Sequence, residues 1–311
     1  MTASPAELVQ VRYRKLKNIN FTVSRICAEQ THVHSSMEIG VILEGQLQVT
    51  GNSGAYAAGP GGLLVFNAYD IHSIVPQGQA TVLFVQLAPS FGKAYFARMV
   101  GVEFSTADSL PDADRTQICN NLLAAAEVYF SEPEAFGLEC ASLVAKSVTL
   151  MLRTIPYKLN TDAEYMAKKK RIGRKQRIAS FLEQHYRDKL TLTQLAQSEG
   201  ITTAYMSRIF GELFHDSFQE YLSRLRLQRA MPMLGKPSVF LVDICMECGF
   251  SDTRYLNAIC KKEYGCTAIQ LRQKMQDPLW KDPHAQQQPE EEPLTDQQSL
   301  ELLQAYNNRQ Q

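Results

Sequence analysis

Short apolar runs separated by glycines dominate residues 19–89 of the chain. Runs of this kind, rich in β-branched and aromatic residues, are typical of β-strands, and the intervening glycines are typical of turns. Many short strands joined by glycine turns predict a β-barrel or a double-sheet jelly roll. The predicted strands are Phe21–Ile26, Met37–Thr50, Leu63–Phe66, Ile71–Val75 and Thr81–Leu87.

The spacing of apolar residues changes near residue 112, where a helical period begins. Residues 112–130 and 134–155 carry apolar positions three and four apart, which predicts two amphipathic helices. Pro133 separates these helices and Pro156 ends the second. An amphipathic helix needs an apolar surface to cover, so we expect residues 111–157 to pack on the barrel or to form a dimer interface.

Composition divides the rest of the chain. Residues 158–171 are polar and end in the basic run Lys168–Arg171, which predicts a linker. Helical periods return over residues 172–275. Residues 276–311 are acidic and rich in glutamine and proline, and we expect a segment with so little apolar surface to stay disordered.

Charge changes this picture, because the net charge of zero over 311 residues hides a strong asymmetry. Residues 168–275 carry 19 Lys and Arg against 10 Asp and Glu, a net charge of +9. Residues 1–167 carry a net charge of −4, and residues 276–311 carry a net charge of −5. A basic block between two acidic ones is the distribution that phosphate binding needs.

The sequence shows no signal peptide and no apolar run long enough for a membrane span, so we expect no membrane association. Its seven cysteines are odd in number and scattered, which suits reduced thiols better than a disulfide framework. Together these observations predict a cytoplasmic protein.

Two segments of the basic block, Leu195–Thr202 and Ile244–Ser251, resemble each other. Each has a short apolar helix, a glycine, an apolar residue and then a hydroxyl residue. Gly200 and Gly249 can take the positive φ that a tight turn requires. The hydroxyl residue, or Asp252 in the second segment, can cap a new helix. The repeat therefore predicts two helix-turn-helix units.

The helices predicted after the turns, Thr203–Leu213 and Thr253–Tyr264, each have one apolar face and one exposed face. Small, polar and cationic side chains on an exposed face suit a helix that enters the major groove of DNA. An all-α packing module that binds no DNA is the alternative, which the agreement of charge and repeat disfavours. The residues predicted to contact DNA are Thr203, Ala204, Ser207, Arg208, Thr253, Arg254, Asn257 and Lys261.

Residues 172–275 resemble the DNA-binding domain of the AraC/XylS family of transcription regulators. The matching stretches, in the expected order and spacing, are LTLTQLAQSEGITTAYMSRIF, SFQEYLSRLRLQRAMPML and VDICMECGFSDTRYLNAICKKEYGCTAIQLR. In that family a long helix joins two helix-turn-helix units, which read adjacent major-groove segments. The resemblance implies that the joining helix here is Phe218–Leu234.

Several residues depart from the family pattern, and most of them lie in the second unit. That unit lacks two common phenylalanines, a usual proline and a common polar or cationic residue, while the first unit lacks a usual glycine. Pro232 lies inside the joining helix, where it removes a hydrogen bond. We therefore expect the two units to read DNA unequally. The departures are His215, Leu256, Ala258, Cys260 and Ala268.

Four polar residues of the predicted barrel have the spacing of a ligand site. His32, His34 and Glu38 form the pattern His-x-His-x3-Glu, which resembles the first motif of the cupin barrel. His72 lies where the second cupin motif places a histidine. Alternate residues on a strand share a face, so the first two histidines can point into one cavity. In metal-binding cupins such residues hold a divalent metal, and these donor types suit Zn, Fe, Ni or Mn.

We expect these four residues to hydrogen-bond an organic effector, because AraC/XylS sensor domains often keep this signature without a catalytic metal. The second motif is also imperfect, since Ala68 stands near the expected proline. No cofactor or resident metal is expected. The main alternative is a metal-dependent cupin enzyme with an accessory helical domain. A weaker alternative is a zinc site without a recognised finger spacing, formed by Cys245, Cys248, Cys260 and Cys266.

The sequence thus predicts an α+β chain, in which a cupin-like jelly roll and two helices precede an all-α domain of two helix-turn-helix units joined by a long helix. We expect a transcription regulator, not an enzyme, that forms a homodimer, binds double-stranded DNA and responds to an unidentified small molecule. The predicted boundaries are 1–110 for the sensing barrel, 111–157 for the helical segment, 158–171 for the linker, 172–275 for the DNA-binding domain and 276–311 for the tail.

Overall fold

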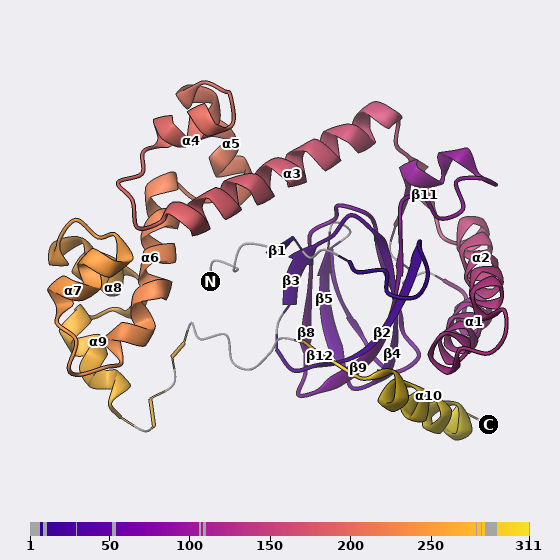
Figure 1. The fold of residues 1–311 in the computed structure, drawn as a ribbon. Coiled ribbons are helices and arrows are strands. Elements are labelled where there is room, and N and C mark those ends of the chain that lie inside the picture. The colour runs from indigo at the N-terminus through magenta and orange to yellow at the C-terminus, as the bar shows by residue number, and fades with distance from the viewer. Residues whose placement is uncertain are drawn as a thin grey trace. The chain divides into compact units, whose positions relative to one another are not determined.

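The chain divides into two units, and each is described by itself. The first, here called the sensor unit, comprises residues 1–170 and 286–311. The second, here called the helical unit, comprises residues 171–285 (Figure 1). The computed structural model describes residues 7–8, 11–28, 30–51, 54–105, 107, 110–277, 279–280, 282–283 and 291–310.

Two five-stranded sheets form the body of the sensor unit, and a separate pair is made by β10 (Val102–Phe104) and β11 (Tyr157–Leu159). The first sheet has the order β1 (Glu7–Leu8), β3 (Gln30–Val33), β8 (His72–Pro76), β5 (Leu47–Gly51) and β6 (Gly54–Ala58). The second sheet has the order β12 (Glu291–Pro293), β2 (Ile19–Ile26), β9 (Ala80–Leu87), β4 (Met37–Glu44) and β7 (Leu63–Phe66). The predicted jelly-roll fold is confirmed.

The inner faces of the two sheets share one apolar core. Leu47 and Ile74 of the first sheet belong to the same buried cluster as Ile42 and Val82 of the second. Neighbouring residues on a strand point to opposite faces, so Val41 belongs to a different cluster on the outer face. Both faces of β4 are therefore buried, which explains why its sequence lacks regular polar alternation.

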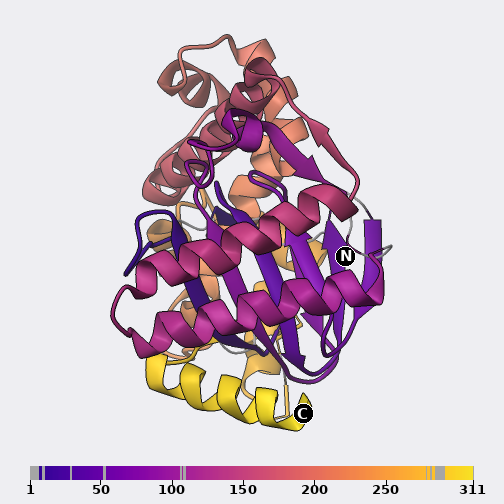
Figure 2. The same cartoon turned by 90° about the vertical axis from the view of Figure 1, so that its right-hand side faces the viewer.

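Two long helices, α1 (Asp112–Ser131) and α2 (Phe136–Thr154), cover the outer face of the second sheet. Figure 2 shows them side by side across the strands. Leu122 of α1 and Val144 of α2 are fully buried in the cluster that also contains Val85 of β9. The packing layer predicted for this segment is confirmed, and its role in dimerisation stays a prediction.

The prediction of a disordered tail is wrong for residues 291–310. Strand β12 pairs antiparallel with β2, and α10 (Asp296–Gln310) packs beside α1 (Figure 2). The physical reason is a small set of apolar residues that the polar composition concealed. Leu294, Leu303 and Tyr306 are buried in the core beneath α1 and α2. The part of the predicted tail at 284–290 lies outside the described residues.

The predicted linker at 158–171 is also wrong, because most of it is helical. Helix α3 runs from Asp162 to His185, and β11 comes directly before it. Thr161 caps the helix, since its hydroxyl accepts the N–H of Glu164 at 3.2 Å while the Glu164 carboxylate accepts the Thr161 N–H at 2.7 Å. The basic run is therefore part of a capped helix that leaves the sensor unit and enters the helical unit.

The helical unit contains two small cores. The first is built around α4 (Leu192–Ser198) and α5 (Thr203–Phe214), and the second around α7 (Leu241–Cys248), α8 (Thr253–Tyr264) and α9 (Ala268–Met275). Helix α6 (Phe218–Leu234) contributes its first half to one core and its second half to the other. It has the bounds predicted for the joining helix, and Pro232 lies within its last turn.

No helix among the residues that the structure describes combines the length and the apolar character that crossing a membrane requires.

Candidate functional site

The turn of the first helix-turn-helix unit has the geometry that its sequence predicts. Gly200 lies between α4 and α5 with φ of 64°, a conformation that favours glycine. Thr202 then caps α5, because its hydroxyl accepts the N–H of Tyr205 at 3.3 Å. Helix α4 begins with a complete capping box between Thr191 and Gln194. Both helices of this unit therefore start at satisfied N-termini.

The second unit repeats the turn with a tighter constraint. Gly249 has φ of 77°, and a Cβ atom there would lie 2.6 Å from the carbonyl oxygen of Tyr186. Of the two residues predicted to cap the next helix, Asp252 does so, since its carboxylate accepts the N–H of Arg254 at 2.7 Å. Glycine is therefore required at this turn for two reasons, its backbone conformation and its lack of a side chain.

The two helices that follow the turns, α5 and α8, present most of the predicted DNA contacts to solvent. The four residues predicted on α5 are all exposed. On α8, Arg254 and Lys261 are exposed, whereas Thr253 and Asn257 are half-buried. The exposed set on α5 consists of Thr203, Ala204, Ser207 and Arg208.

Two of the predicted contacts on α8 have partners within the unit. Asn257 Oδ1 accepts the N–H of Ala268 at 2.9 Å and so caps α9. A proline at position 268 would lack that N–H, which gives a physical reason for the alanine. Arg254 donates to Asp252 Oδ2 from Nε at 3.1 Å and from a terminal nitrogen at 2.8 Å. Its guanidinium is thereby held near the N-terminus of α8.

Sequence reasoning missed one exposed aromatic residue on each of these helices. Tyr205 is 37% exposed and Tyr255 is 60% exposed, and each follows a threonine by two positions. The guanidinium of Arg208 lies 5.1 Å from the ring centroid of Tyr205, close enough for a cation–π interaction. The shared Thr-x-Tyr spacing was the available signal, since both helices begin with it.

The cysteines of the second unit pack as apolar residues. Cys245, Cys248, Cys260 and Cys266 are all buried in its core and none forms a disulfide. Burial raises the pKa of Cys245 to about 11 and that of Cys260 to about 12. Among the residues that the structure describes, these cysteines do not form a group whose sulfur atoms converge as metal ligands would. Their burial in the core therefore favours packing over a zinc site.

In the sensor unit, three histidines and one carboxylate meet between the two sheets. His32 on β3 lies opposite His72 on β8, its register partner. Glu38 reaches them from β4, and His34 follows the end of β3. The Nε2 atoms of His32 and His72 are 3.0 Å apart. Glu38 Oε2 lies 3.9, 3.3 and 3.6 Å from the Nε2 atoms of His32, His34 and His72. We call these four residues the barrel cluster.

Three side chains of the barrel cluster are held by residues outside it. Gln86, the register partner of Glu38 on β9, donates to Glu38 Oε1 at 2.7 Å, which leaves Oε2 facing the histidines. His34 Nδ1 lies 2.8 Å from the carbonyl oxygen of Ser36, and the ring of His72 stacks on Phe66. His34 and His72 are 1% exposed, and Glu38 is 2% exposed.

Burial opposes charge on these groups, and their mutual contacts act against burial. Burial raises the pKa of Glu38, yet the neighbouring histidines, above all His34, hold it well below its usual range. Burial lowers the pKa of His72 to about 4. Burial also lowers the pKa of His34, but attraction to Glu38 outweighs this effect and leaves that pKa raised. At neutral pH the cluster therefore contains a charged carboxylate and a neutral His72.

The loop between β7 and β8 is bonded to two members of the barrel cluster. The N–H of Tyr69 donates to the carbonyl oxygen of His34 at 2.8 Å. One residue further on, the carbonyl oxygen of Asp70 accepts a hydrogen bond of 3.1 Å from Nδ1 of His72. Tyr69 has φ of 65°, so this loop is held in a conformation that few non-glycine residues adopt. The loop and the cluster therefore form one connected structure.

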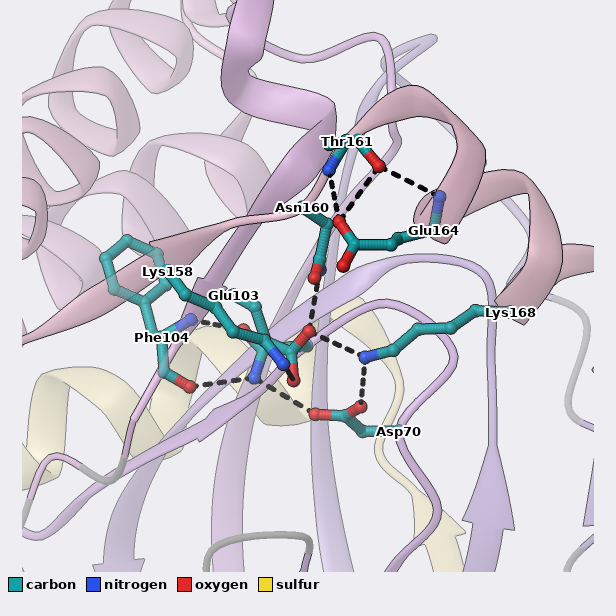
Figure 3. A network of polar contacts seen from close by, with 9 residues as sticks. Asp70, Glu103, Phe104, Lys158, Asn160, Thr161, Glu164 and Lys168 are labelled. Atoms are coloured by element: carbon teal, nitrogen blue, oxygen red, sulfur yellow. Dashed lines mark hydrogen bonds and ion pairs between the residues drawn. The ribbon is translucent and has the colours of Figure 1, made fainter.

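The same loop also holds the beginning of α3 (Figure 3). Lys168 Nζ on α3 lies 3.5 Å from Asp70 Oδ1 and 2.6 Å from Glu103 Oε2 on β10. The ring of Tyr165, one turn earlier on α3, makes an edge contact with Tyr69 at 5.6 Å between centroids. Two contacts thus join the loop to one face of the helix that enters the helical unit.

A small apolar cavity lies in the same region of the sensor unit. Its volume is about 30 Å³, and its lining includes Met37, Leu87, Met99 and Tyr165. Such a volume holds about two water molecules. It is too small for an organic effector.

Two known families match separate parts of the chain. The AraC-like ligand binding domain matches residues 22–137, and a helix-turn-helix domain matches residues 195–274. The first match covers the barrel cluster and α1. The second covers both turns and both exposed helices described above.

Similar proteins include named regulators. An uncharacterized HTH-type transcriptional regulator of Staphylococcus aureus is 18% identical over 217 residues, 70% of this chain and 29% of that protein. The HTH-type transcriptional regulator ExsA of Pseudomonas aeruginosa is 29% identical over 98 residues, 32% of this chain and 35% of that protein. The solved structure of ToxT from Vibrio cholerae is 12% identical, covering 82% of this chain and 98% of its own, with a TM-score of 0.37.

The chain spans about a third of the length of the curated relatives it matches. The matched segments nevertheless include both of its parts, the sensing barrel and the helix-turn-helix pair, in the order that the resemblance implied. The chain therefore contains an AraC-like ligand binding domain followed by a helix-turn-helix domain.

Proposed function

We propose that this protein regulates transcription by binding double-stranded DNA through α5 and α8. The observation that carries the proposal is the pair of exposed faces on helices that follow a glycine turn and a satisfied N-cap. Both helices lie in the segment 168–275, whose net charge is +9. Phosphate contacts need that charge, and base contacts need short polar or cationic side chains on an accessible helix.

Within this proposal, the side chain of Arg254 on α8 is already held in place before DNA binds. Asp252 holds the Arg254 guanidinium at two points, which limits the rotamers that the side chain samples before DNA arrives. Asn257 contributes less, because its carbonyl oxygen already caps α9. We propose DNA contacts at Thr203, Ala204, Ser207, Arg208, Thr253, Arg254, Asn257 and Lys261, with Tyr205 and Tyr255 beside them.

The test is binding of the full chain to the promoter DNA of its own gene and its neighbours over a salt series. Affinity should fall steeply as salt rises, because bound phosphates release counterions. The double variant Arg208→Ala with Arg254→Ala should lose specific binding. The matched control is Lys146→Ala, which removes an exposed cation from α2 of the sensor unit. A DNA affinity that changes neither with the salt concentration nor in the double variant contradicts the proposal.

We also propose that occupancy of the barrel cluster alters DNA binding through the loop at 67–71. Tyr69 and Asp70 are hydrogen-bonded to cluster histidines on one side and contact α3 on the other. A ligand that moves His72 therefore acts on the residue that binds Lys168. A ligand changes the DNA affinity only if it binds one state of this element better than the other.

A double-mutant cycle tests that route without knowledge of the ligand. His72→Gln and Lys168→Gln should each change DNA affinity, and their combined effect should differ from the sum of the two. Lys169→Gln is the control, since its side chain is exposed and adjacent to Lys168. Strictly additive effects, or an equal effect of the control, contradict the route.

We further propose a cytoplasmic homodimer without catalytic activity. All seven cysteines are free, which suits a reducing compartment. Leu138 on α2 is 77% exposed, and an apolar side chain on that helix suits a subunit contact. The Leu138→Glu variant should shift the sedimentation coefficient toward that of a monomer, and an unchanged coefficient contradicts this contact. Turnover of any substrate that is lost in His34→Ala would instead support the alternative, a cupin-type enzyme.

A further inference from the structure

We propose that the ligand of the barrel cluster is one divalent transition-metal ion, bound by His32, His34, Glu38 and His72. This inference rests on the regulatory function proposed above and names the chemical class of the signal. Four donor atoms, one from each side chain, all lie within 4.8 Å of one another. Such convergence inside a protein core requires either a cation at the centre or protons between the donors.

The hydrogen bonds of two rings decide which nitrogen of each faces the centre. Nδ1 of His34 contacts the carbonyl oxygen of Ser36, and Nδ1 of His72 contacts that of Asp70. A carbonyl oxygen only accepts, so both Nδ1 atoms carry the proton. In a neutral imidazole the opposite nitrogen then has a free lone pair. Both Nε2 lone pairs point toward Glu38 Oε2, as in histidines that bind a metal and donate to a carbonyl behind them.

The centre of the barrel cluster contains polar atoms that the protein itself does not satisfy. His34 Nε2 and Glu38 Oε2 are both buried and make no hydrogen bond beyond the ion-pair contact of 3.3 Å between them. The other carboxylate oxygen is satisfied by Gln86, so the free oxygen is the one that faces the three rings. A buried polar atom without a partner costs about 1–3 kcal/mol, and more if it is charged. A cation at the centre gives both atoms a partner and so removes this cost.

The spacing of the donors matches a metal ion and leaves no room for a larger ligand. Four ligands at about 2.0–2.1 Å from a tetrahedral ion lie roughly 3.3 Å apart. The distances from Glu38 Oε2 to the Nε2 atoms of the three rings are 3.3, 3.6 and 3.9 Å, and those of His32 and His72 are 3.0 Å apart. The remaining pairs of donors lie within 4.8 Å of each other. An organic effector would have to push these buried side chains apart. An ion needs only small adjustments.

The donor set indicates which ions fit. Three imidazoles and one carboxylate suit Zn²⁺, Ni²⁺, Fe²⁺ and similar ions, whereas Mg²⁺ and Ca²⁺ prefer oxygen donors. For tetrahedral Zn²⁺, four protein ligands close the coordination shell, which is typical of a structural site, while catalytic Zn²⁺ sites keep an open position. His32 is the only one of the four with appreciable exposure, 13% of its side chain, and so marks the entry side.

The experiment uses the full chain with any purification tag removed. The protein is stripped with a chelator, exchanged into metal-free buffer, loaded with Zn²⁺ and then freed of excess ion. Elemental analysis should find one Zn²⁺ per chain. Loading with Co²⁺ should give the strong visible absorption of a tetrahedral complex, and Zn²⁺ should displace it. Absence of stoichiometric Zn²⁺ overturns the inference, because protons then hold the cluster together as a His34–Glu38 ion pair.

Variants assign the binding to these residues. Glu38→Gln and His72→Gln preserve side-chain size but remove a metal donor, and each should weaken Zn²⁺ binding by more than about 100-fold. His185→Gln is the matched control, since His185 lies in the helical unit beside Asp188 and should not affect binding. A cooperative melting curve checks that each variant folds. Equal Zn²⁺ affinity in the variants and the control contradicts the assignment.

The DNA-binding assay separates this inference from the proposed function. The Zn²⁺-loaded and stripped proteins are compared on the same promoter DNA. A stripped protein that binds DNA in a salt-dependent way but takes up no Zn²⁺ leaves the function standing and removes the metal. A protein that binds one Zn²⁺ but no DNA does the reverse. If both inferences hold, Zn²⁺ shifts DNA affinity in the wild type and not in Glu38→Gln.

Discussion

The two helix-turn-helix units share a backbone plan but differ in what stabilises it. The first core contains an aromatic group in which Phe210 stacks on Phe214 and meets Phe218 and Tyr221 edge-on. At the position of Phe210, the second unit has Cys260, which is surrounded by other buried cysteines. Both units therefore form the same motif with different core residues, while the turn glycine and the N-cap of the following helix are kept.

The units also differ at their surfaces. In the first unit, α4 begins at a capping box, and Tyr205 is its large apolar residue with notable exposure. In the second, α7 begins after Phe240 without a side-chain cap, and five large apolar residues, in its helices and at the residue before them, are exposed. A unit with fewer caps and more exposed apolar surface is expected to be the less stable of the two. The five exposed residues are Phe240, Val242, Met246, Tyr255 and Ile269.

Helices α5 and α8 place their arginines one turn apart. Aligned from the shared Thr-x-Tyr start, Arg208 of α5 corresponds to Ala258 of α8, and Arg254 of α8 corresponds to Ala204 of α5. An arginine near the start of a helix and one a turn later reach different base pairs in the groove. The departure at Ala258 is therefore accompanied by a new cation in the same helix, and we expect the second unit to read DNA differently rather than not at all.

The largest expected effect tests the difference between the cores. Phe210→Ala should lower the free energy of unfolding by about 3–5 kcal/mol, because it leaves a large cavity. The corresponding change, Cys260→Ala, removes a single heavy atom and should cost about 1 kcal/mol. Urea denaturation followed by circular dichroism measures both. Trp280, the one tryptophan, packs against the second core and reports on that unit separately. Equal losses would show that the aromatic group adds no stability.

The next effect compares the two turn glycines. Gly249→Ala should destabilise the second unit by about 3 kcal/mol, since the new Cβ meets the Tyr186 carbonyl oxygen as well as an unfavourable φ. Gly200→Ala meets no atom within 4 Å and should cost only the backbone conformation, about 1–2 kcal/mol. Thermal unfolding of both variants is the measurement. A larger loss at Gly200 would contradict the packing constraint assigned to the second turn.

The shifted arginines predict changes in DNA sequence preference. Arg254→Ala and Arg208→Ala should each weaken specific binding by roughly 5- to 150-fold and relax preference at one position of the site. Because the two arginines lie one helical turn apart along α5 and α8, the two positions that lose their base preference should not be equivalent in the two half-sites. Selection from a randomised DNA library reveals them. A uniform loss over all sequences would instead identify the arginine as a phosphate contact.

The smallest expected effect is a gain in stability. His215 ends α5 with φ of 54°, whereas the corresponding residue after α8 is Gly265 with φ of 70°. His215→Gly should stabilise the first unit by about 0.5–1 kcal/mol, because glycine adopts this conformation without steric cost. A modest rise in melting temperature is the expected result. A fall would show that the histidine side chain makes a contact worth more than its backbone strain.

Local signals allowed much of the helical unit to be predicted from the sequence. Helix α6 has the predicted bounds, and α5 extends one residue beyond its prediction, because caps and turn glycines fix helix ends. The tail and the linker were missed for the opposite reason. Leu303 and Tyr306 are isolated apolar residues in a polar segment. Their structural role is evident only from the core in which they are buried.

The barrel cluster was likewise predicted only in part. Its four residues were predicted from spacing, and the structure brings them together. The groups that orient them, such as Gln86 and the carbonyl oxygens of Ser36 and Asp70, carry no sequence signature, because backbone contacts depend on strand register. The contacts of the loop that joins the cluster to α3 likewise could not be predicted, because they depend on the strand register.

The return of the chain to the sensor unit after residue 285 makes the helical unit an insertion rather than an appendage. It is connected to the sensor unit at both ends, by α3 and by the segment that leads to β12. Its freedom to diffuse is therefore smaller than that of a domain attached through a single linker. A truncation at the apparent end of the helix-turn-helix domain would also strip β12 from β2 and uncover a strand edge. Fragments designed from the family boundaries are therefore expected to aggregate through the sensor unit, even though the residues proposed to contact DNA are intact.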